Sequence, residues 1–137
     1  MARILIAEDD PSVRAFVVSA LTMKGHEVVA EEDGGLAAET MEAEAGRFDL
    51  LLSDIKMPVM DGIALALQVG AAFPDVTIVL MTGFADQRER AHGLEALVYD
   101  VIVKPFTLAE LLAKVEDALE GKPVEVLSLA KQAMNER

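Results

Sequence analysis

Short apolar runs alternate along the chain with longer segments in which apolar residues recur every three or four positions. The runs cover residues 4–7, 28–30, 50–53, 76–81 and 98–103. A run that is apolar at consecutive positions and too short for a helix is typical of a strand buried on both faces of a parallel sheet. The pattern therefore predicts five apolar strands, and the run at residues 50–53 is expected to be buried on both faces.

The segments between and after these strands have the sequence features of helices. The predicted helices cover about residues 11–24, 36–45, 62–73, 86–94 and 108–120. Asp10 and Thr107 stand where N-caps are expected, and Glu110 has the capping-box spacing from Thr107. The Gly34-Gly35 pair predicts a turn before the second helix.

The first and last of these helices carry the clearest apolar faces. The face of the first helix is predicted to contain Val13, Phe16, Val17, Ala20 and Leu21. The face of the last helix is predicted to contain Leu108, Leu111, Leu112, Val115 and Leu119. Both faces are expected to be buried against the sheet.

Strands that alternate with helices imply a parallel sheet joined by right-handed crossovers, with helices on both faces. We therefore predict a doubly wound α/β fold of five strands and five helices. The alternation ends near Gly121, so residues 1–121 are predicted to form one domain. Residues 122–137 are predicted to be a C-terminal tail, either a short helix or flexible.

Charge and composition exclude several classes of function. The chain has 24 acidic and 12 basic residues, a formal charge of -12, which disfavours binding to nucleic acid or to anionic membranes. It has no cysteine, which excludes disulfides and thiol chemistry. The first apolar run is too short for a signal peptide or a spanning helix, so a cytoplasmic protein is expected.

Polar side chains end four of the predicted strands. Asp9 and Asp10 follow the first strand, Asp54 the third, Thr82 the fourth and Lys104 the fifth. The carboxyl ends of parallel strands share one edge of a sheet, so these side chains are expected to meet. Clustered carboxylates repel one another, and Mg²⁺ relieves that repulsion. A carboxylate beside a metal, a hydroxyl and an ammonium group is suited to accept a phosphoryl group.

These residues stand in four motifs with a recognisable order and spacing. The motifs are Ile6-Ala-Glu-Asp-Asp10, Asp54-Ile-Lys-Met-Pro-Val-Met-Asp-Gly62, Met81-Thr-Gly83 and Val103-Lys-Pro-Phe106. Together they resemble the receiver domains of two-component response regulators, the CheY-like superfamily, over about Arg3 to Glu120. One motif alone is weak evidence, but four in register at predicted strand ends are specific. The resemblance implies a flavodoxin-like fold with strand order 2-1-3-4-5.

The resemblance also implies roles for the acids at the strand ends. Asp54 matches the phosphoacceptor of the family. Asp9 and Asp10 match the metal-binding acids. Asp54 and the backbone carbonyl of Lys56 are the expected further ligands of Mg²⁺.

Two more residues match family positions that contact the phosphoryl group. Thr82 matches the switch hydroxyl, and Lys104 matches the lysine that contacts the phosphoryl oxygens. The bond between the matching lysine and proline is cis in the family, so a cis bond is expected between Lys104 and Pro105.

Family membership implies particular partners. The expected phosphoryl donor is a histidine kinase or a histidine phosphotransfer protein, and the expected output is phosphorylation-dependent protein binding, not catalysis. Met81–Arg90 and Tyr99–Phe106 resemble the CpdR type of alpha-proteobacterial receivers. For that type, the unphosphorylated form is an adaptor of the ClpXP protease in cell-cycle control. A stand-alone receiver is expected, because no output domain follows Gly121.

Two other functions fit part of the pattern. A small phosphohydrolase with an aspartate nucleophile would need that nucleophile and a second aspartate two residues apart after the first strand, whereas Asp9 and Asp10 are adjacent. A pseudo-receiver would have the fold and accept no phosphoryl group. Turnover of a phosphate ester, or failure to accept a phosphoryl group, would distinguish these alternatives from a receiver.

Overall fold

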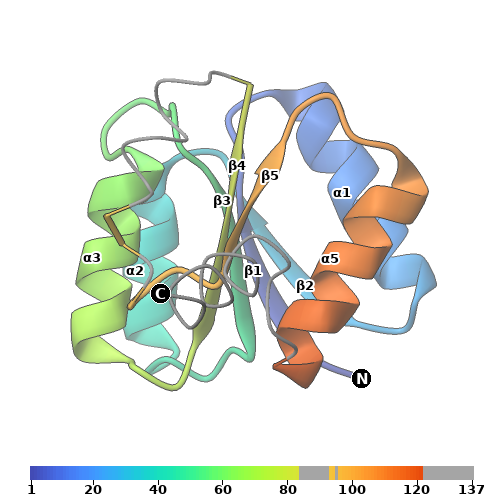
Figure 1. The fold of residues 1–137 in the computed structure, drawn as a ribbon. Coiled ribbons are helices and arrows are strands. Elements are labelled where there is room, and N and C mark those ends of the chain that lie inside the picture. The colour runs from blue at the N-terminus through green and yellow to red at the C-terminus, as the bar shows by residue number, and fades with distance from the viewer. Residues whose placement is uncertain (84–92, 95, 122–137) are drawn as a thin grey trace, which may run out of the picture.

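The computed structural model describes residues 1–83, 93–94 and 96–121. Its elements are β1 (Arg3–Ala7), α1 (Pro11–Met23), β2 (Glu27–Glu31), α2 (Gly34–Ala43), β3 (Leu50–Asp54), α3 (Gly62–Ala72), β4 (Thr77–Thr82), β5 (Asp100–Val103) and α5 (Leu108–Glu120). The strands form one parallel sheet in the order β2-β1-β3-β4-β5. Helices α1 and α5 cover one face of the sheet and α2 and α3 cover the other (Figure 1). The predicted doubly wound sheet and its strand order are confirmed.

The helix count differs from the prediction of five, because the described part of the chain contains four helices. Most of the helix expected over Asp86–Leu94 lies outside the described residues, because the structure does not describe residues 84–92. Of that expected helix, only residues 93 and 94 are described. The segment 122–137 also lies outside them. Across the described ranges, no helix combines the length and the apolar character needed to cross a lipid bilayer.

Two apolar clusters, one on each face of the sheet, form the core. Leu51 packs with the residues on the α2 and α3 side, whereas Leu50 and Leu52 pack with those on the α1 and α5 side. All three leucines of β3 are completely buried. Successive side chains of a strand point to opposite faces, so a central strand must be apolar at every position. The short apolar runs therefore marked the strands correctly, and β3 carries Asp54 to the middle of the sheet edge.

Helix α2 starts earlier than the sequence predicts. The Gly34-Gly35 pair is the first turn of the helix, and the expected turn at this position is wrong. Asp33 caps the helix by accepting a hydrogen bond from the backbone N–H of Leu36 at 2.8 Å. A Cβ at residue 34 would overlap the carbonyl oxygen of Met60, so close packing against that loop requires glycine here.

Two residues predicted to be buried on helix faces are exposed. Phe16 is 41% exposed and Leu108 is 39% exposed. Phe16 lies at the margin of the α1 stripe, where its ring centroid is 6.3 Å from that of Phe106 in the turn before α5. The apolar stripe of α1 is therefore wider than the part of it that the sheet covers.

Candidate functional site

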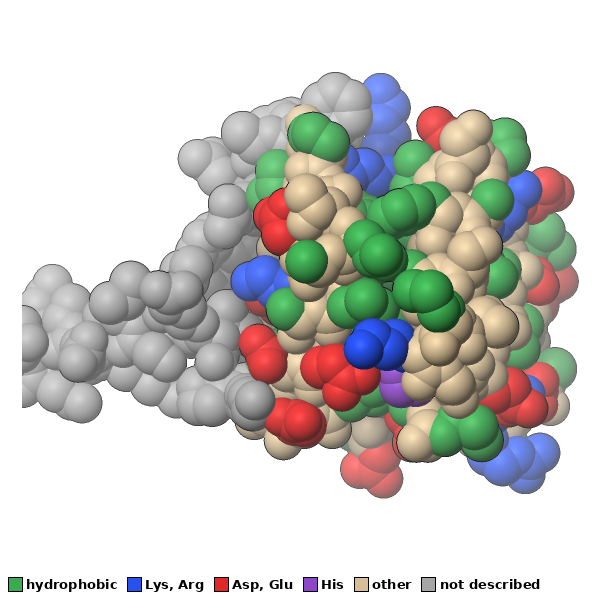
Figure 2. Space-filling view, turned by 90° about the vertical axis from the view of Figure 1, so that its right-hand side faces the viewer, with side chains coloured by type: hydrophobic (Ala, Val, Ile, Leu, Met, Phe, Trp, Pro, Cys, Tyr) green, Lys and Arg blue, Asp and Glu red, His purple; other side chains and the backbone are tan. Residues whose placement is uncertain are grey.

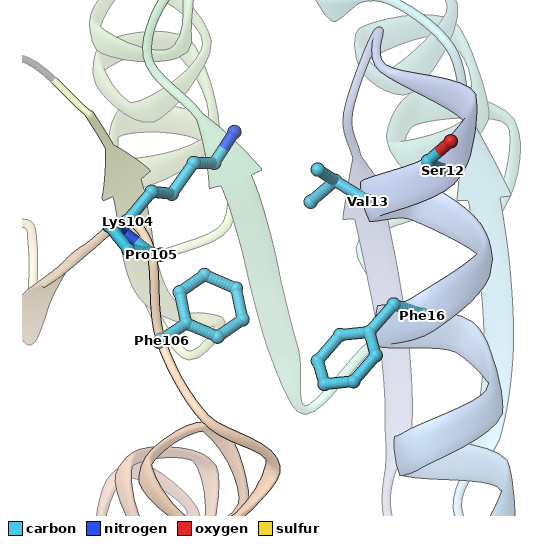
Figure 3. Close-up of a pocket in the computed structure, with 6 residues that line it drawn as sticks. All are labelled: Ser12, Val13, Phe16, Lys104, Pro105 and Phe106. Carbon is cyan, nitrogen blue, oxygen red and sulfur yellow. The ribbon is translucent and has the colours of Figure 1, made fainter.

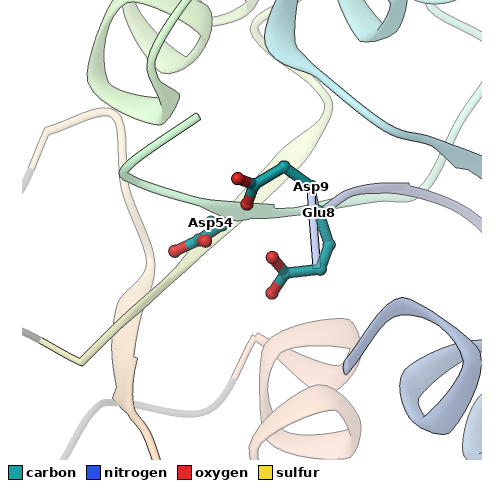
Figure 4. Close-up of side chains that lie close together, drawn as sticks. All are labelled: Glu8, Asp9 and Asp54. Atoms are coloured by element: carbon teal, nitrogen blue, oxygen red, sulfur yellow. The ribbon is translucent and has the colours of Figure 1, made fainter. Parts of the chain in front are cut away.

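Three carboxylates converge at the carboxyl edge of the sheet. Glu8 and Asp9 follow β1, and Asp54 is the last residue of the adjacent strand β3. One carboxylate oxygen from each of the three lies within 4.8 Å of the others (Figure 4). Parallel pairing of β1 with β3 aligns Ala7 with Ser53, so the residues that follow both strands emerge side by side. This is the edge at which doubly wound sheets bind ligands.

Glu8 is the most enclosed of these acids, with no exposed surface. Its Oε1 accepts a hydrogen bond from Lys104 Nζ at 2.6 Å, and its Oε2 accepts one from the backbone N–H of Asp10 at 3.2 Å. Burial raises the pKa of Glu8 to about 7, with a further contribution from the nearby charge of Asp54. The hydrogen bonds from Lys104 and Asp10 oppose that increase.

Asp10 stands apart from the cluster, although the sequence pairs it with Asp9 as a metal-binding acid. Its Oδ1 accepts hydrogen bonds from the backbone N–H groups of Ser12 at 2.8 Å and Val13 at 3.2 Å. Asp10 is thus the N-cap of α1, as predicted. The structure brings Glu8, not Asp10, together with Asp9 and Asp54. The sequence offered one indication of Glu8. Asp10, which precedes Pro11, was already predicted to cap the first helix, so Glu8 and Asp9 were the acids left to face Asp54.

Asp54 is 7% exposed, and its two carboxylate oxygens have different neighbours. Oδ1 accepts a hydrogen bond from the backbone N–H of Ile55 at 2.9 Å, and Oδ2 lies 3.2 Å from Lys104 Nζ. The ammonium group of Lys104 therefore bridges Glu8 and Asp54. Burial lowers the pKa of Lys104, but the hydrogen bond to Glu8 and the charges of Asp54 and Glu8 outweigh burial and raise it overall.

The remaining predicted residues lie at the neighbouring strand ends. Thr82 ends β4 almost fully buried, and its carbonyl accepts a hydrogen bond from the backbone N–H of Lys104 at 2.7 Å. The peptide bond between Lys104 and Pro105 is cis, as predicted. Lys56 lies two residues beyond the end of β3, with its side chain exposed. The strand ends thus place Asp54, Thr82 and Lys104 along one edge.

The raised pKa of Glu8 predicts a pH dependence of stability. Between the unfolded value of 4.5 and about 7, the folded protein holds a proton that the unfolded chain releases. The extra proton contributes on the order of 3 kcal/mol to the free energy of unfolding. This contribution is complete below pH 4.5 and is lost as the pH rises to 7. The free energy of unfolding, measured with denaturant in the absence of divalent cations, should therefore decline more steeply between pH 4.5 and 7 in wild type than in Glu8→Gln. The exposed Glu32→Gln should behave like wild type; equal slopes for wild type and Glu8→Gln would contradict the prediction.

The five-stranded parallel sheet and the acidic cluster at its carboxyl edge define the class of response regulator receiver domains. The family model for the response regulator receiver domain matches residues 4–116. The chain therefore belongs to the response regulator receiver family, whose members act in two-component signal transduction.

Several characterised proteins are similar to this chain. The response regulator receiver protein CpdR of Brucella abortus is 40% identical over 119 residues, which cover 87% of this chain and 98% of CpdR. The transcriptional regulatory protein PrrA of Mycobacterium tuberculosis is 37% identical over 120 residues, and the chain spans about half of PrrA, 51% of its length. The sensor kinase CckA of Brucella abortus is 32% identical over 119 residues, which cover 87% of this chain and 13% of CckA.

Solved structures agree with the fold. The response regulator TrrA of Thermotoga maritima, solved in complex with Mg²⁺-BeF, has a TM-score of 0.77 and 29% identity, covering 86% of this chain and 99% of TrrA. The receiver domain of the hybrid histidine kinase CckA has a TM-score of 0.72 and 30% identity, covering 85% of this chain and 98% of that domain.

Proposed function

We propose that this chain accepts a phosphoryl group on Asp54 in a Mg²⁺-dependent reaction. The observation that carries the proposal is the placement of Asp54: a nearly buried carboxylate whose Oδ2 lies 3.2 Å from Lys104 Nζ, beside two further acids. A nucleophilic carboxylate and a fixed cation are the parts that phosphoryl transfer needs. The complex of the similar protein TrrA with Mg²⁺-BeF supports the assignment.

The acids of the cluster fit Mg²⁺. Neighbouring ligands of an octahedral Mg²⁺ are about 3 Å apart and opposite ligands about 4 Å apart, because each lies roughly 2.1 Å from the ion. The three oxygens that lie within 4.8 Å of one another need only a small shift to meet this geometry. We infer that Glu8, Asp9 and Asp54 hold the ion, together with the backbone carbonyl of Lys56. A bound Mg²⁺ would neutralise charge on the phosphoryl oxygens.

The groups of this chain have separate tasks in the proposed transfer. Asp54 Oδ2 forms a bond to phosphorus as the bond between phosphorus and the donor's histidine nitrogen breaks. Ile55 N–H holds Oδ1, which fixes the direction in which Oδ2 points. Lys104 Nζ is within reach of a phosphoryl oxygen on Oδ2, and the Thr82 hydroxyl is proposed to move toward another. The new charge then favours one of two surface conformations.

The donor and the effector are proposed from the similar proteins. A histidine kinase or a histidine phosphotransfer protein would supply the phosphoryl group, and the similarity to the sensor kinase CckA is consistent with this chemistry. An effector protein would then bind one of the two surface conformations in preference to the other. Because its motifs resemble those of the CpdR type, we propose that this chain acts as an adaptor of the ClpXP protease in cell-cycle control and is active without phosphorylation. The chain is similar to CpdR of Brucella abortus over 98% of that protein.

This proposal predicts the behaviour of Asp54→Ala in a binding assay with the ClpX unfoldase. In the presence of Mg²⁺ and a small phosphodonor, wild type should lose at least about tenfold in affinity, which corresponds to 1.4 kcal/mol. Asp54→Ala should keep its affinity, because it cannot be phosphorylated. The exposed Asp75→Ala serves as the matched control and should respond like wild type. Equal loss of binding in wild type and Asp54→Ala would contradict the adaptor proposal without affecting the receiver assignment.

A further inference from the structure

Helix α1 has two different flanks beside its buried stripe. Figure 2 shows hydrophobic side chains in a band between α1 and α5. Where this band reaches Lys104, Val13 and Phe16 point from α1 toward Lys104 and Phe106 (Figure 3). At roughly 100° per residue, Arg14 lies about 200° around the helix from Phe16. The side chain of Arg14 therefore belongs to the opposite flank of α1, away from this band.

On that flank, Arg14 contacts the backbone of the turn between β1 and α1. Its Nη1 donates a hydrogen bond to the carbonyl oxygen of Glu8 at 2.8 Å. Its backbone N–H donates another to the carbonyl oxygen of Asp10 at 2.9 Å. The Arg14 side chain is half-buried, and a hydrogen bond from a charged group is stronger there than in water. One residue thus holds both ends of the turn at residues 8–10.

The Glu8 carbonyl needs a donor because it lies just beyond the sheet. The pairing of β1 with β2 and β3 ends at Ala7. The Glu8 N–H still donates to the Glu31 carbonyl at 3.1 Å, but the Glu8 carbonyl follows the last paired residue. Glu8 is fully buried, and a buried carbonyl without a hydrogen bond is costly. The guanidinium of Arg14 supplies the hydrogen bond.

The peptide that Arg14 holds is the one that joins Glu8 to Asp9. The carboxylates of Glu8 and Asp54 accept hydrogen bonds of their own. Asp9 is exposed, and within the part of the chain that the structure describes no hydrogen bond or ion pair holds its carboxylate. The direction of the Asp9 side chain therefore depends on the orientation of its backbone, which the Glu8 carbonyl fixes.

We propose that Arg14 is a positioning residue that fixes the peptide between Glu8 and Asp9 and so keeps the Asp9 carboxylate in the cluster with Asp54. This inference rests on the proposed function, in which Glu8, Asp9 and Asp54 hold Mg²⁺. Arg14 is not itself a ligand, because a guanidinium group is a cation with no acceptor atom. Loss of a group that only orients a metal ligand commonly lowers metal affinity about 10- to 100-fold.

The charge of Arg14 gives this role a distinctive signature. A positive charge beside the cluster repels Mg²⁺, so removal of the charge alone would strengthen binding of the ion. Loss of the hydrogen bond to Glu8 instead frees the peptide that carries Asp9 and would weaken binding. The two effects have opposite signs, so the direction of the change in Mg²⁺ affinity identifies the role of Arg14.

The test is a calorimetric titration of Arg14→Met with Mg²⁺ at pH 8. We expect the dissociation constant to rise at least about tenfold. Lys24→Met is the matched control, because it removes an equal charge from an exposed position about 20 Å away along α1. Its dissociation constant should change less than about twofold, since a charge at that distance is screened. Thermal unfolding of both variants shows that the fold is intact.

NMR of wild type provides a measurement that needs no variant. The guanidinium protons of Arg14 should give separate, slowly exchanging signals both without Mg²⁺ and with it bound. Averaged signals in the Mg²⁺-bound protein would overturn the proposal. Unchanged or tighter Mg²⁺ binding in Arg14→Met, beside normal binding by wild type, would overturn the positioning role and leave the proposed function in place. Failure of wild type to bind Mg²⁺ would overturn both.

Discussion

Glu8→Gln is expected to weaken Mg²⁺ binding at least about tenfold, whereas Asp10→Asn should change it less than about twofold. Loss of a residue that only orients a metal ligand commonly lowers affinity 10- to 100-fold, so loss of a ligand itself should do no less. Glu8 lies in the carboxylate cluster with Asp9 and Asp54. Asp10 instead caps α1, and asparagine is an equally good cap.

The measurement is a calorimetric titration with Mg²⁺ at pH 8, where Glu8 is ionised in wild type because its pKa is about 7. Asp9→Asn serves as the positive control and should behave like Glu8→Gln. Thermal unfolding of each variant separates loss of the site from loss of the fold. A tenfold loss of Mg²⁺ affinity in Asp10→Asn and no loss in Glu8→Gln would support Asp9 and Asp10 as the metal ligands. It would contradict the proposal that Glu8, Asp9 and Asp54 bind the ion.

Gly62→Ala is expected to destabilise the domain by about 1–3 kcal/mol and to impair phosphorylation of Asp54. A Cβ at residue 62 would overlap the carbonyl oxygen of Asp54 and would lie 2.9 Å from Ile55 Cα. These neighbours are backbone atoms and cannot rotate away, unlike the end of a side chain. The loop is also closed by the hydrogen bond from Gly62 N–H to the Ile55 carbonyl at 2.7 Å, so relief requires movement of Asp54 itself.

Gly93→Ala is the matched control, because no heavy atom of the residues that the structure describes lies within 4 Å of the position that its Cβ would take. Its free energy of unfolding should change by less than about 1 kcal/mol. Denaturant unfolding measures the free energy of unfolding of both variants. The intact mass after treatment with a phosphodonor shows whether Asp54 is still phosphorylated. If Gly62→Ala unfolds at the same denaturant concentration as wild type, the close approach to Asp54 does not constrain the loop.

The bridging position of Lys104 links the stability of the site to its chemistry. Its Nζ lies 2.6 Å from Glu8 Oε1 and 3.2 Å from Asp54 Oδ2. A buried ion pair contributes little net stability, but removal of one member leaves an uncompensated charge. The lysine therefore keeps two repelling acids together at the sheet edge, in the position that the proposed metal and phosphoryl group require.

Much of the fold could be predicted from local patterns. The short apolar runs identified β1, β3 and β4 because these central strands are buried on both faces. The edge strands β2 and β5 are less buried, but their runs are also largely apolar. The capping box between Thr107 and Glu110 placed the start of α5 correctly, and both of its hydrogen bonds are present. These signals are local, since each depends on residues only a few positions apart.

The wrong or incomplete predictions depended on distant contacts. Gly34 begins a helix because of its approach to Met60, which no local pattern reveals. Phe16 fits the apolar period of α1 but lies beyond the area that the sheet covers. Asp10 was already the predicted N-cap of α1, but only the pairing of β1 with β3 shows that Glu8 and Asp9 are the acids that lie beside Asp54.

The most direct test of the central proposal is the intact mass of the protein after incubation with a small phosphodonor and Mg²⁺. We expect a gain of one phosphoryl group that is absent without metal and absent in Asp54→Asn, and strongly reduced in Glu8→Gln. No gain in wild type, or an equal gain in Asp54→Asn, would contradict the assignment of Asp54 as the acceptor and favour a pseudo-receiver whose unmodified surface binds its partner.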